Sequence, residues 1–473
     1  MAVAPEQYPA TDSLSVSDRT PSRHSSIQGP YRDGSKDTSF PIYRRVESPG
    51  TVTDEIYARS LLGTGNGTPL SDAVGNLSRP QLHLKNGAFL GDVGYVSQSG
   101  YFHFAFNIFS AAAHPLHKYG VPPTFSPALS AISKDDSVVI PNYHPPGTVI
   151  ASPGITVTQA VDPLAVQFDT TAIEGAVLVL PAGASREDLV DPSRFYPYLK
   201  EHATSWYQYY NGNSDRTAQD RHTANGTLCI VIGVDRVESW AMATFPVRNK
   251  HVGEPRRFRY IANSPDSPWK DDAGSTLHES KRLSDGAMGV VFLRVMTVAL
   301  SSGEWSRNVA YIPPEEVQSY ATLSTRAPGL GSRIRRVLPR LRLFSKEKTW
   351  ADTTLIFHPS IVLSHILILT ELSATVAVVP DSVWCSQLSG QTLTHEEVVI
   401  LIRKIIDNFD IVTEDGIATF TSRGNDQKNM TQSKPPHSSM SSYVRWIIPW
   451  SVRSKSKDTR TKALENMKKV LSI

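Results

Sequence analysis

Between residues 85 and 300 the apolar side chains occur in short runs, rich in β-branched and aromatic types, which prolines and polar turns interrupt. Two of these runs, 89–96 and 101–109, are joined by turn-forming residues 97–100, a pattern that predicts a β-hairpin. The prolines between 110 and 165 disfavour helix interiors and central strands. This part of the chain is therefore expected to form an antiparallel sheet with long loops or edge strands.

Further strands are expected at 149–150, 155–157, 175–180, 227–234, 239–245, 257–261 and 289–299. We expect the first two to belong to the same sheet as the hairpin. Residues 235–238 are polar and predict the turn of a meander. Together these segments predict a β-rich domain over residues 81–325.

One principal helix is expected within this domain. Phe195, Leu199 and Trp206 recur at helical spacing, which predicts a helix over about 193–210. Upstream, Ser185 and Asp188 have the spacing of a capping box, which predicts that a helical turn begins there.

A basic segment, residues 326–348, carries eight Lys or Arg against one Glu and is expected to be a connector. Beyond it, expected strands and helices alternate at 353–357, 359–372, 375–379, 394–408 and 417–420. Such alternation is typical of a small α/β subdomain, here 349–423. The predicted fold class is α+β: a β-rich antiparallel core with one principal helix, plus this C-terminal α/β subdomain and disordered termini.

Both ends of the chain have the composition of disordered segments. Residues 1–80 are dense in Ser, Thr, Pro, Gly and charge and follow neither a helical nor a strand period. Residues 424–473 hold ten Lys or Arg against three acids, a charge of +7, so the rest of this +3 chain carries −4. We expect a disordered N-terminal segment and a basic, disordered tail.

Several features point to the cell interior. The 473 residues include two cysteines, Cys229 and Cys385, too few and too far apart for a disulfide scaffold. The first residues lack the basic start and apolar run of a signal peptide. The most apolar window, 361–369, is far shorter than the roughly 20 residues of a membrane span. We therefore expect no transmembrane segment and a location in the cytoplasm or nucleus.

Histidines provide the weak candidates for a metal site. Two of them flank Pro115, which favours a loop over the helix that would bring both to one face. The candidate ligands are His103, His114, His117 and His144. The alternative is that these histidines stabilise loops, and we expect neither a metal nor another cofactor.

If the chain is an enzyme, its cleft should lie where polar residues end strands beside a helix start. The candidate residues are Arg186, Asp188, His202, Trp206, Asp235 and Trp240. Alternatively, the segment around Asp188 is a helix cap, and His202 and Trp206 pack in the core. The glycine-rich stretch 63–67 lacks the Lys-Ser/Thr of a phosphate-binding loop.

The basic tail offers a different kind of surface. Arg445, Trp446, Trp450 and Arg453 combine cations with aromatic rings, as anion-binding or membrane-surface segments do. A solvated, disordered tail without a ligand is the alternative.

Several phrases resemble a large group of uncharacterised proteins of mushroom-forming (basidiomycete) fungi. The phrases lie between about 85 and 420, and most of them fall in the block 180–240. They include Leu90–Gly94, His144–Gly147, Leu180–Leu189, Ser205–Tyr207 and Ser239–Trp240. The resemblance implies a fungal, intracellular protein, and it assigns no activity, cofactor or site residue.

Three functional hypotheses follow. The leading one is an intracellular, non-enzymatic interaction module that binds a protein partner. The second is an enzyme or accessory protein of fungal secondary metabolism. The third is attachment to nucleic acid or an anionic membrane through residues 424–473.

Overall fold

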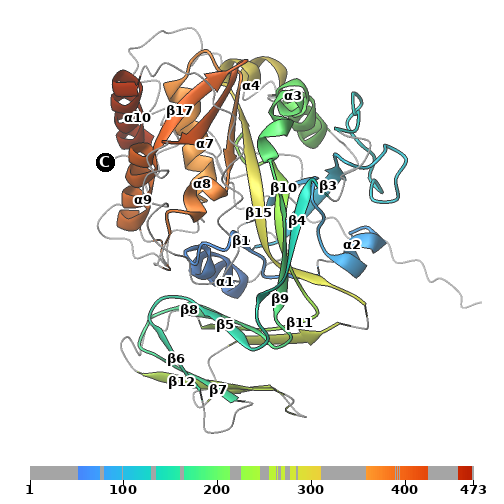
Figure 1. Cartoon of the computed structure of the whole chain (residues 1–473), viewed down its shortest axis with the longest axis vertical. Helices are drawn as coiled ribbons and strands as arrows, with labels where there is room; N and C mark the ends of the chain where they lie inside the picture. The colour runs from blue at the N-terminus through green and yellow to red at the C-terminus, as the bar shows by residue number, and fades with distance from the viewer. Residues whose placement is uncertain are drawn as a thin grey trace, which may run out of the picture. The chain divides into compact units, whose positions relative to one another are not determined.

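The computed structural model describes residues 52–74, 79–97, 100–128, 135–159, 165–212, 225–245, 255–262, 264, 268–271, 277–283, 286–309, 358–388, 390, 393, 395–423 and 456–470. The chain divides into units 1–37 and 38–473, and every described residue belongs to the second. Its fold is α+β, with mostly antiparallel strand pairing, as the sequence predicts (Figure 1). The connector 326–348 and the expected strand 353–357 lie outside the described residues.

The largest sheet, sheet A, has ten strands, of which seven follow the order β17-β18-β16-β15-β10-β2-β3. The expected hairpin is confirmed as the antiparallel pair β2–β3. Strand β1 pairs with β15, while β9 pairs with β10 on one side and β4 on the other. The strands are β1 (Thr68–Pro69), β2 (Asp92–Val96), β3 (Phe102–Asn107), β4 (Ser137–His144), β9 (Ala184–Leu189), β10 (Cys229–Val237), β15 (Gly289–Leu300), β16 (Val376–Pro380), β17 (Phe409–Glu414) and β18 (Ile417–Ser422).

Helices cover both faces of sheet A, as β16 shows. Its Ala377 and Val379 pack with helices α7 (Pro359–Thr370), α9 (His395–Asn408) and α10 (Ser456–Val470), while Val376 and Val378 pack with α3 (Tyr196–Gly212). Side chains of a strand alternate between the two faces of its sheet, so a strand buried on both faces is apolar throughout. The remaining helices are α1 (Val52–Leu62), α2 (Gln81–Asn86), α4 (Ser302–Asn308) and α8 (Ser382–Cys385).

The alternating strands and helices of 359–423 are present, but they do not form a sheet of their own. Strand β16 pairs antiparallel with β15 over five residues, and β18 pairs parallel with β16. The expected α/β subdomain is therefore an extension of the main sheet. Hydrogen bonds between β15 and β16 join the regions before and after the basic connector into one sheet.

Two four-stranded sheets form a sandwich. Sheet B has the order β14-β11-β8-β5 and sheet C the order β13-β12-β7-β6. Phe168 and Phe258 of sheet C pack against Val177 and Ala243 of sheet B. The strands are β5 (Thr148–Ala151), β6 (Ile155–Gln159), β7 (Ala165–Thr170), β8 (Gly175–Leu180), β11 (Ser239–Phe245), β12 (Arg256–Ile261), β13 (Trp269–Asp271) and β14 (Leu277–Arg282).

Two expectations about sheet membership are wrong. Strands β5 and β6 belong to sheets B and C rather than to the sheet of the hairpin. Strands β10 and β11 do not form a meander, because they lie in sheets A and B, respectively. Residues 235–237, expected in a turn, continue β10. Asp235 can lie in a buried strand because two arginines neutralise it.

The segment 185–188 is also not a helical turn. It is the middle of β9, whose two edges are paired with β4 and β10, so its backbone groups are already hydrogen-bonded in a sheet. The helix begins later: Asp191 caps a 3₁₀ turn, η1 (Pro192–Phe195), and α3 follows. The expected helix over 193–210 is confirmed.

The N-terminal boundary of the fold lies earlier than residue 81. Residues 52–74, expected to be disordered, contain α1 and β1, and Tyr57 and Leu61 of α1 are buried against sheet B. The apolar residues of α1 lie within a long segment rich in Ser, Thr, Pro and Gly, and the composition of the whole segment concealed them. Residues 1–51 lie outside the described residues.

The C-terminal tail is in part a docked helix. In α10, Ala463 and Met467 are buried beside α7 and α9, and Arg460 pairs with Asp407. The expectation of a disordered tail is therefore wrong for residues 456–470. The high Lys content obscured two apolar residues spaced four apart, which face the core.

Candidate functional site

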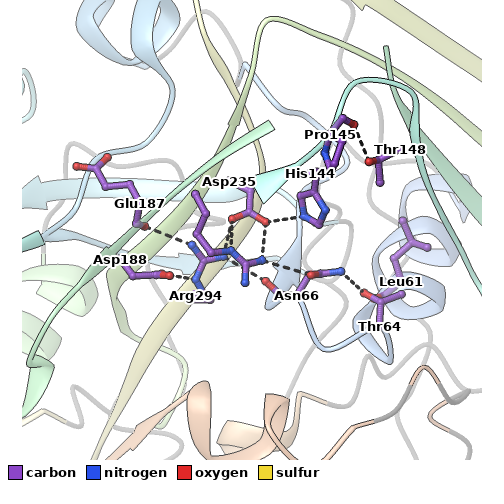
Figure 2. Close-up of polar contacts among 11 residues, drawn as sticks. Leu61, Thr64, Asn66, His144, Pro145, Thr148, Glu187, Asp188, Asp235 and Arg294 are labelled. Atoms are coloured by element: carbon purple, nitrogen blue, oxygen red, sulfur yellow. Dashed lines mark hydrogen bonds and ion pairs between the residues drawn. The ribbon is translucent and has the colours of Figure 1, made fainter. Parts of the chain in front are cut away.

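A group of charged side chains, here called the Asp235 cluster, gathers where β9, β10 and β15 run side by side (Figure 2). It consists of Asp235, Arg186, Arg294, Asp188 and His144. Asp235 is completely buried, and the two arginine side chains are only 11% and 14% exposed. Because an unpaired buried charge is very costly, the pairing decides what this cluster can do.

Both arginines donate hydrogen bonds to Asp235. Arg186 donates through Nε to Oδ1 at 2.9 Å and through Nη2 to Oδ2 at 2.8 Å. Arg294 donates through Nη1 to the same Oδ1 at 2.8 Å and through Nε to Asp188. His144 Nε2 lies 3.3 Å from Oδ2 of Asp235. Two arginines and two aspartates thus balance one another.

The pairing also controls ionisation. Burial by itself would raise the pKa of Asp235, but hydrogen bonds from His144 and Arg186 and the charges of both arginines outweigh it and hold that pKa well below its usual range. Burial would likewise lower the pKa of Arg294, yet Asp235 and Asp188 raise it. Asp235 and Arg294 therefore keep their charges near neutral pH, while burial raises the pKa of Asp188.

The strand register brings the cluster together. Asp235 lies opposite Arg186 of β9, and Gly233 lies opposite both Asp188 of β9 and Arg294 of β15. Gly233 leaves room for the side chains of these two neighbours to meet. A Cβ at position 233 would lie 1.9 Å from Oδ1 of Asp188 and 2.5 Å from Nε of Arg294.

We expect Gly233→Ala to lower the free energy of unfolding by about 1–3 kcal/mol, because the methyl group forces Asp188 and Arg294 apart. Urea denaturation followed by circular dichroism measures the change. Gly303→Ala is the matched control, since an added Cβ there meets only Arg307 Nη2, at 3.6 Å, and it should be neutral or slightly stabilising. Equal effects of the two substitutions would show that the contact across Gly233 is unimportant.

A bulge in β4 covers the cluster from outside. The β4–β9 register breaks between Ile140 and His144, and Asn142 there has a φ of 53°. The bulge turns Tyr143 onto Arg186, whose guanidinium carbon lies 3.5 Å from the ring centroid. It also brings His144 to Asp235. This local strain is used to enclose the charges.

The glycine-rich loop 63–67 also contacts the cluster, through Asn66 (Figure 2). Asn66 accepts hydrogen bonds from Arg186 through its side chain and from Arg294 through its backbone carbonyl, both at 3.3 Å. Gly67, with a φ of 108°, passes so close to β15 that a Cβ would lie 2.3 Å from the carbonyl oxygen of Leu293. Only a residue without a Cβ allows this close approach at position 67. The cluster therefore holds the loop to the sheet.

A second polar network, the Asp381 network, contacts Thr68, the residue that follows the loop 63–67. Asp381 is buried and accepts hydrogen bonds from Val295 N at 3.0 Å and from Ser360 Oγ and Trp384 Nε1, both at 2.9 Å. Thr68 Oγ1 lies 2.9 Å from His358 Nε2 and donates to Asp381 at 3.5 Å. Burial raises the pKa of Asp381 and lowers that of His358. This network fastens residue 68 to β15 and α7.

Only half of the six cleft candidates converge. Arg186, Asp188 and Asp235 meet in the Asp235 cluster. Trp240 packs in the core between sheet B and α1, and His202 and Trp206 lie on α3. The ring of His202 lies 4.3 Å from that of Tyr198, centroid to centroid, in a tilted arrangement, and burial lowers the pKa of His202. The core interpretation of His202 and Trp206 holds, and Trp240 is buried in the core as well.

Arg294 belongs to the cluster and Asn66 contacts it, and both are absent from the sequence candidates. Arg294 carried a usable signal, since it is the one charged residue within the apolar run 289–299 and a buried charge requires a partner. Asn66 carried none, because its role depends on a backbone approach that only the fold creates.

The four candidate metal ligands do not converge. His117 bonds to the backbone of Asn107 and Ala112, His114 accepts from the Leu116 amide, and His103 stacks on Tyr95. His144 belongs to the Asp235 cluster. Among the described residues, no three His, Cys, Asp or Glu side chains are grouped so that they could hold a metal ion.

The edge strand β6 is a candidate interaction surface of another kind. Within the described part of the chain, β6 pairs only with β7, so its other edge is uncovered. Its sequence, Ile155–Gln159, has no charged residue, proline or bulge, the devices that usually protect an edge strand. Val157, opposite the buried Phe168, faces the inside of the sandwich, yet it is 44% exposed.

The other sequence candidates, Arg445, Trp446, Trp450 and Arg453, lie outside the described residues. None of the helices in the described ranges is long and apolar enough to cross a bilayer. Comparison with known proteins finds no match of this chain to a protein-family model, a curated protein or a solved structure.

Proposed function

We propose that this chain is a non-enzymatic interaction module that binds a protein partner at the uncovered edge of β6. The observation that carries the proposal is an edge strand without protective features, with an apolar inner-face residue, Val157, left partly in water. An open edge of this kind offers unpaired backbone N–H and C=O groups to an added strand.

The Asp235 cluster supports the non-enzymatic part of this proposal, because its charged side chains have a structural task. Its arginines and aspartates are engaged with one another and with the loop at Asn66, so their arrangement explains how the loop is held. We also infer that the protein works in a reducing compartment, the cytoplasm or nucleus. Both cysteines are free thiols, and burial raises the pKa of each, which keeps them protonated.

The test is affinity capture from a host lysate with wild type, Val157→Lys and Val139→Lys. Lysine at an edge is a natural block to strand pairing. Val139 is the matched control: it is 58% exposed on another edge strand, β4, which is already interrupted by a proline and a bulge. We expect a protein bound in stoichiometric amount to wild type and Val139→Lys at about 0.5 M salt, where charge contacts are screened, and lost from Val157→Lys.

The proposal fails if no protein is retained, or if Val157→Lys retains the same protein as wild type. Each variant is first checked for an unchanged thermal unfolding midpoint, so that a loss of binding reports on the edge and not on the fold.

A further inference from the structure

We infer that the strand which covers β6 is β6 of a second copy of this chain. In this arrangement two β6 strands run antiparallel about a two-fold axis at Val157 and join two copies of sheet C into one. The inference rests on the proposed function, since it names the partner of the same edge.

The sequence of β6 is complementary to itself in this register. With Val157 opposite Val157 of the partner, Thr156 lies opposite the partner's Thr158, and Ile155 opposite the partner's Gln159. Thr–Thr and β-branched pairs stabilise neighbouring strands, and no like charges meet in a strand without charges. A two-fold axis makes every contact away from the axis occur twice, as in most homodimers.

The direction of the side chains fits this pairing. In the β6–β7 register Val157 is opposite Phe168, and Thr156 and Thr158 are opposite Asp169 and Gln167. Val157 therefore lies on the core face and the threonines on the outer face. Pairing across the axis covers the exposed part of Val157 with the same residue of the second copy, while the threonines stay at the solvent face.

The second layer of the sandwich extends the contact. Three residues, 152–154, link β5 to β6, so the edge strands of sheets B and C end on the same side of the sandwich. Val149 of β5 is partly buried in the same core. Two short strands per copy make a small interface, and such interfaces belong to weak complexes. We therefore expect a dissociation constant of roughly micromolar size.

Sedimentation velocity of the full chain measures the association between about 1 and about 100 μM, a range that brackets such a constant. We expect wild type and Val139→Lys to shift from monomer to dimer over this range. In Val157→Lys two ammonium groups would meet at the axis, and since like charges at an interface are strongly unfavourable, the dissociation constant should rise at least about tenfold. Thr158→Lys serves as a second variant, because its side chain is on the solvent face and leaves the core untouched.

Cysteine cross-linking tests the register itself. Directly opposite residues of an antiparallel pair have Cα atoms about 4.5–5.5 Å apart, within the reach of a disulfide. Under mild oxidation Val157→Cys should form a covalent dimer, whereas Val139→Cys and wild type, with its own two thiols, should not. A mixture of Thr156→Cys and Thr158→Cys should form the mixed dimer faster than either variant forms its own.

The outcomes separate the two proposals. A monomeric wild type at about 100 μM, or a dimer that Val157→Lys leaves intact, overturns self-pairing. If the monomer nevertheless captures another protein through Val157, the interaction module stands and only the identity of its partner is wrong. If neither association occurs, both proposals fall.

Discussion

Asp235→Ala is expected to lower the free energy of unfolding by about 3–5 kcal/mol, the usual cost of removing one partner from a buried ion pair. The substitution leaves Arg186 and the Nη1 group of Arg294 buried without the carboxylate that both contact. Asp235→Asn keeps an acceptor oxygen but not the charge, so it should lower the free energy of unfolding by less than Asp235→Ala does. Chemical denaturation at neutral pH provides the measurement.

The matched control is Asp169→Asn, which breaks an exposed ion pair with Arg257 and should cost no more than about 1 kcal/mol. If Asp235→Ala costs as little as this control, the cluster does not hold the fold together, and the role assigned to it is wrong.

The loss of unfolding free energy in Asp235→Asn should depend on pH in a defined way. The pKa of Asp235 is lower in the folded chain than its unfolded value of about 3.9. The stabilisation from its charge is therefore complete above the unfolded pKa and decreases as the pH falls below it. The difference in unfolding free energy between wild type and Asp235→Asn should be largest near neutral pH and shrink below about pH 4. A difference that grows on acidification would contradict the pairing.

Asp381→Ala should have the second large effect. It removes the acceptor of the Val295 amide and of the Ser360 hydroxyl, both buried, and one of the two acceptors of the Trp384 indole N–H, which also donates to Ser360 Oγ. Each buried donor left without a partner costs about 1–3 kcal/mol, so the two donors that lose theirs should cost about 2 kcal/mol or more. Asp381→Asn retains one acceptor oxygen and should cost clearly less.

Hydrogen exchange adds a local readout for this variant. Since Thr68 donates to Asp381, amides of residues 63–70 should exchange faster in Asp381→Ala than in wild type. Glu304→Gln, in a helix pair at the surface, is the control that should leave this segment unchanged. Unchanged protection of 63–70 in Asp381→Ala would show that the network does not hold it.

The sequence predicted the elements whose pattern is local. The hairpin β2–β3, helix α3 and the strand β8 follow from runs of apolar residues that one can read over ten positions. Sheet membership could not be read in this way, because β5, β6, β10 and β11 have similar compositions and differ only in their distant partners. Backbone pairing carries no signature in one strand alone.

For the candidate site, the sequence likewise predicted residues with a local signal but not the partners that lie far away in the chain. Arg186, Asp188 and Asp235 drew attention as charges beside apolar strands, and they do meet. Their role was misjudged, since the segment around Asp188 looked like a helix cap and Asp235 like a turn. A charge in a strand is intelligible only when its counter-charge is known, and Arg294 lies 59 residues away from Asp235 in the chain.

The contacts of Thr68 bear on the order of events during synthesis. This residue reaches His358 and Asp381, which follow it by 290 and 313 positions. Contacts so distant in sequence make folding slow, because a long loop must close before they form. While the ribosome is still adding the C-terminal third, Thr68 lacks these partners and β15 lacks its neighbour β16. The nascent chain should therefore depend on chaperones until β16 is complete.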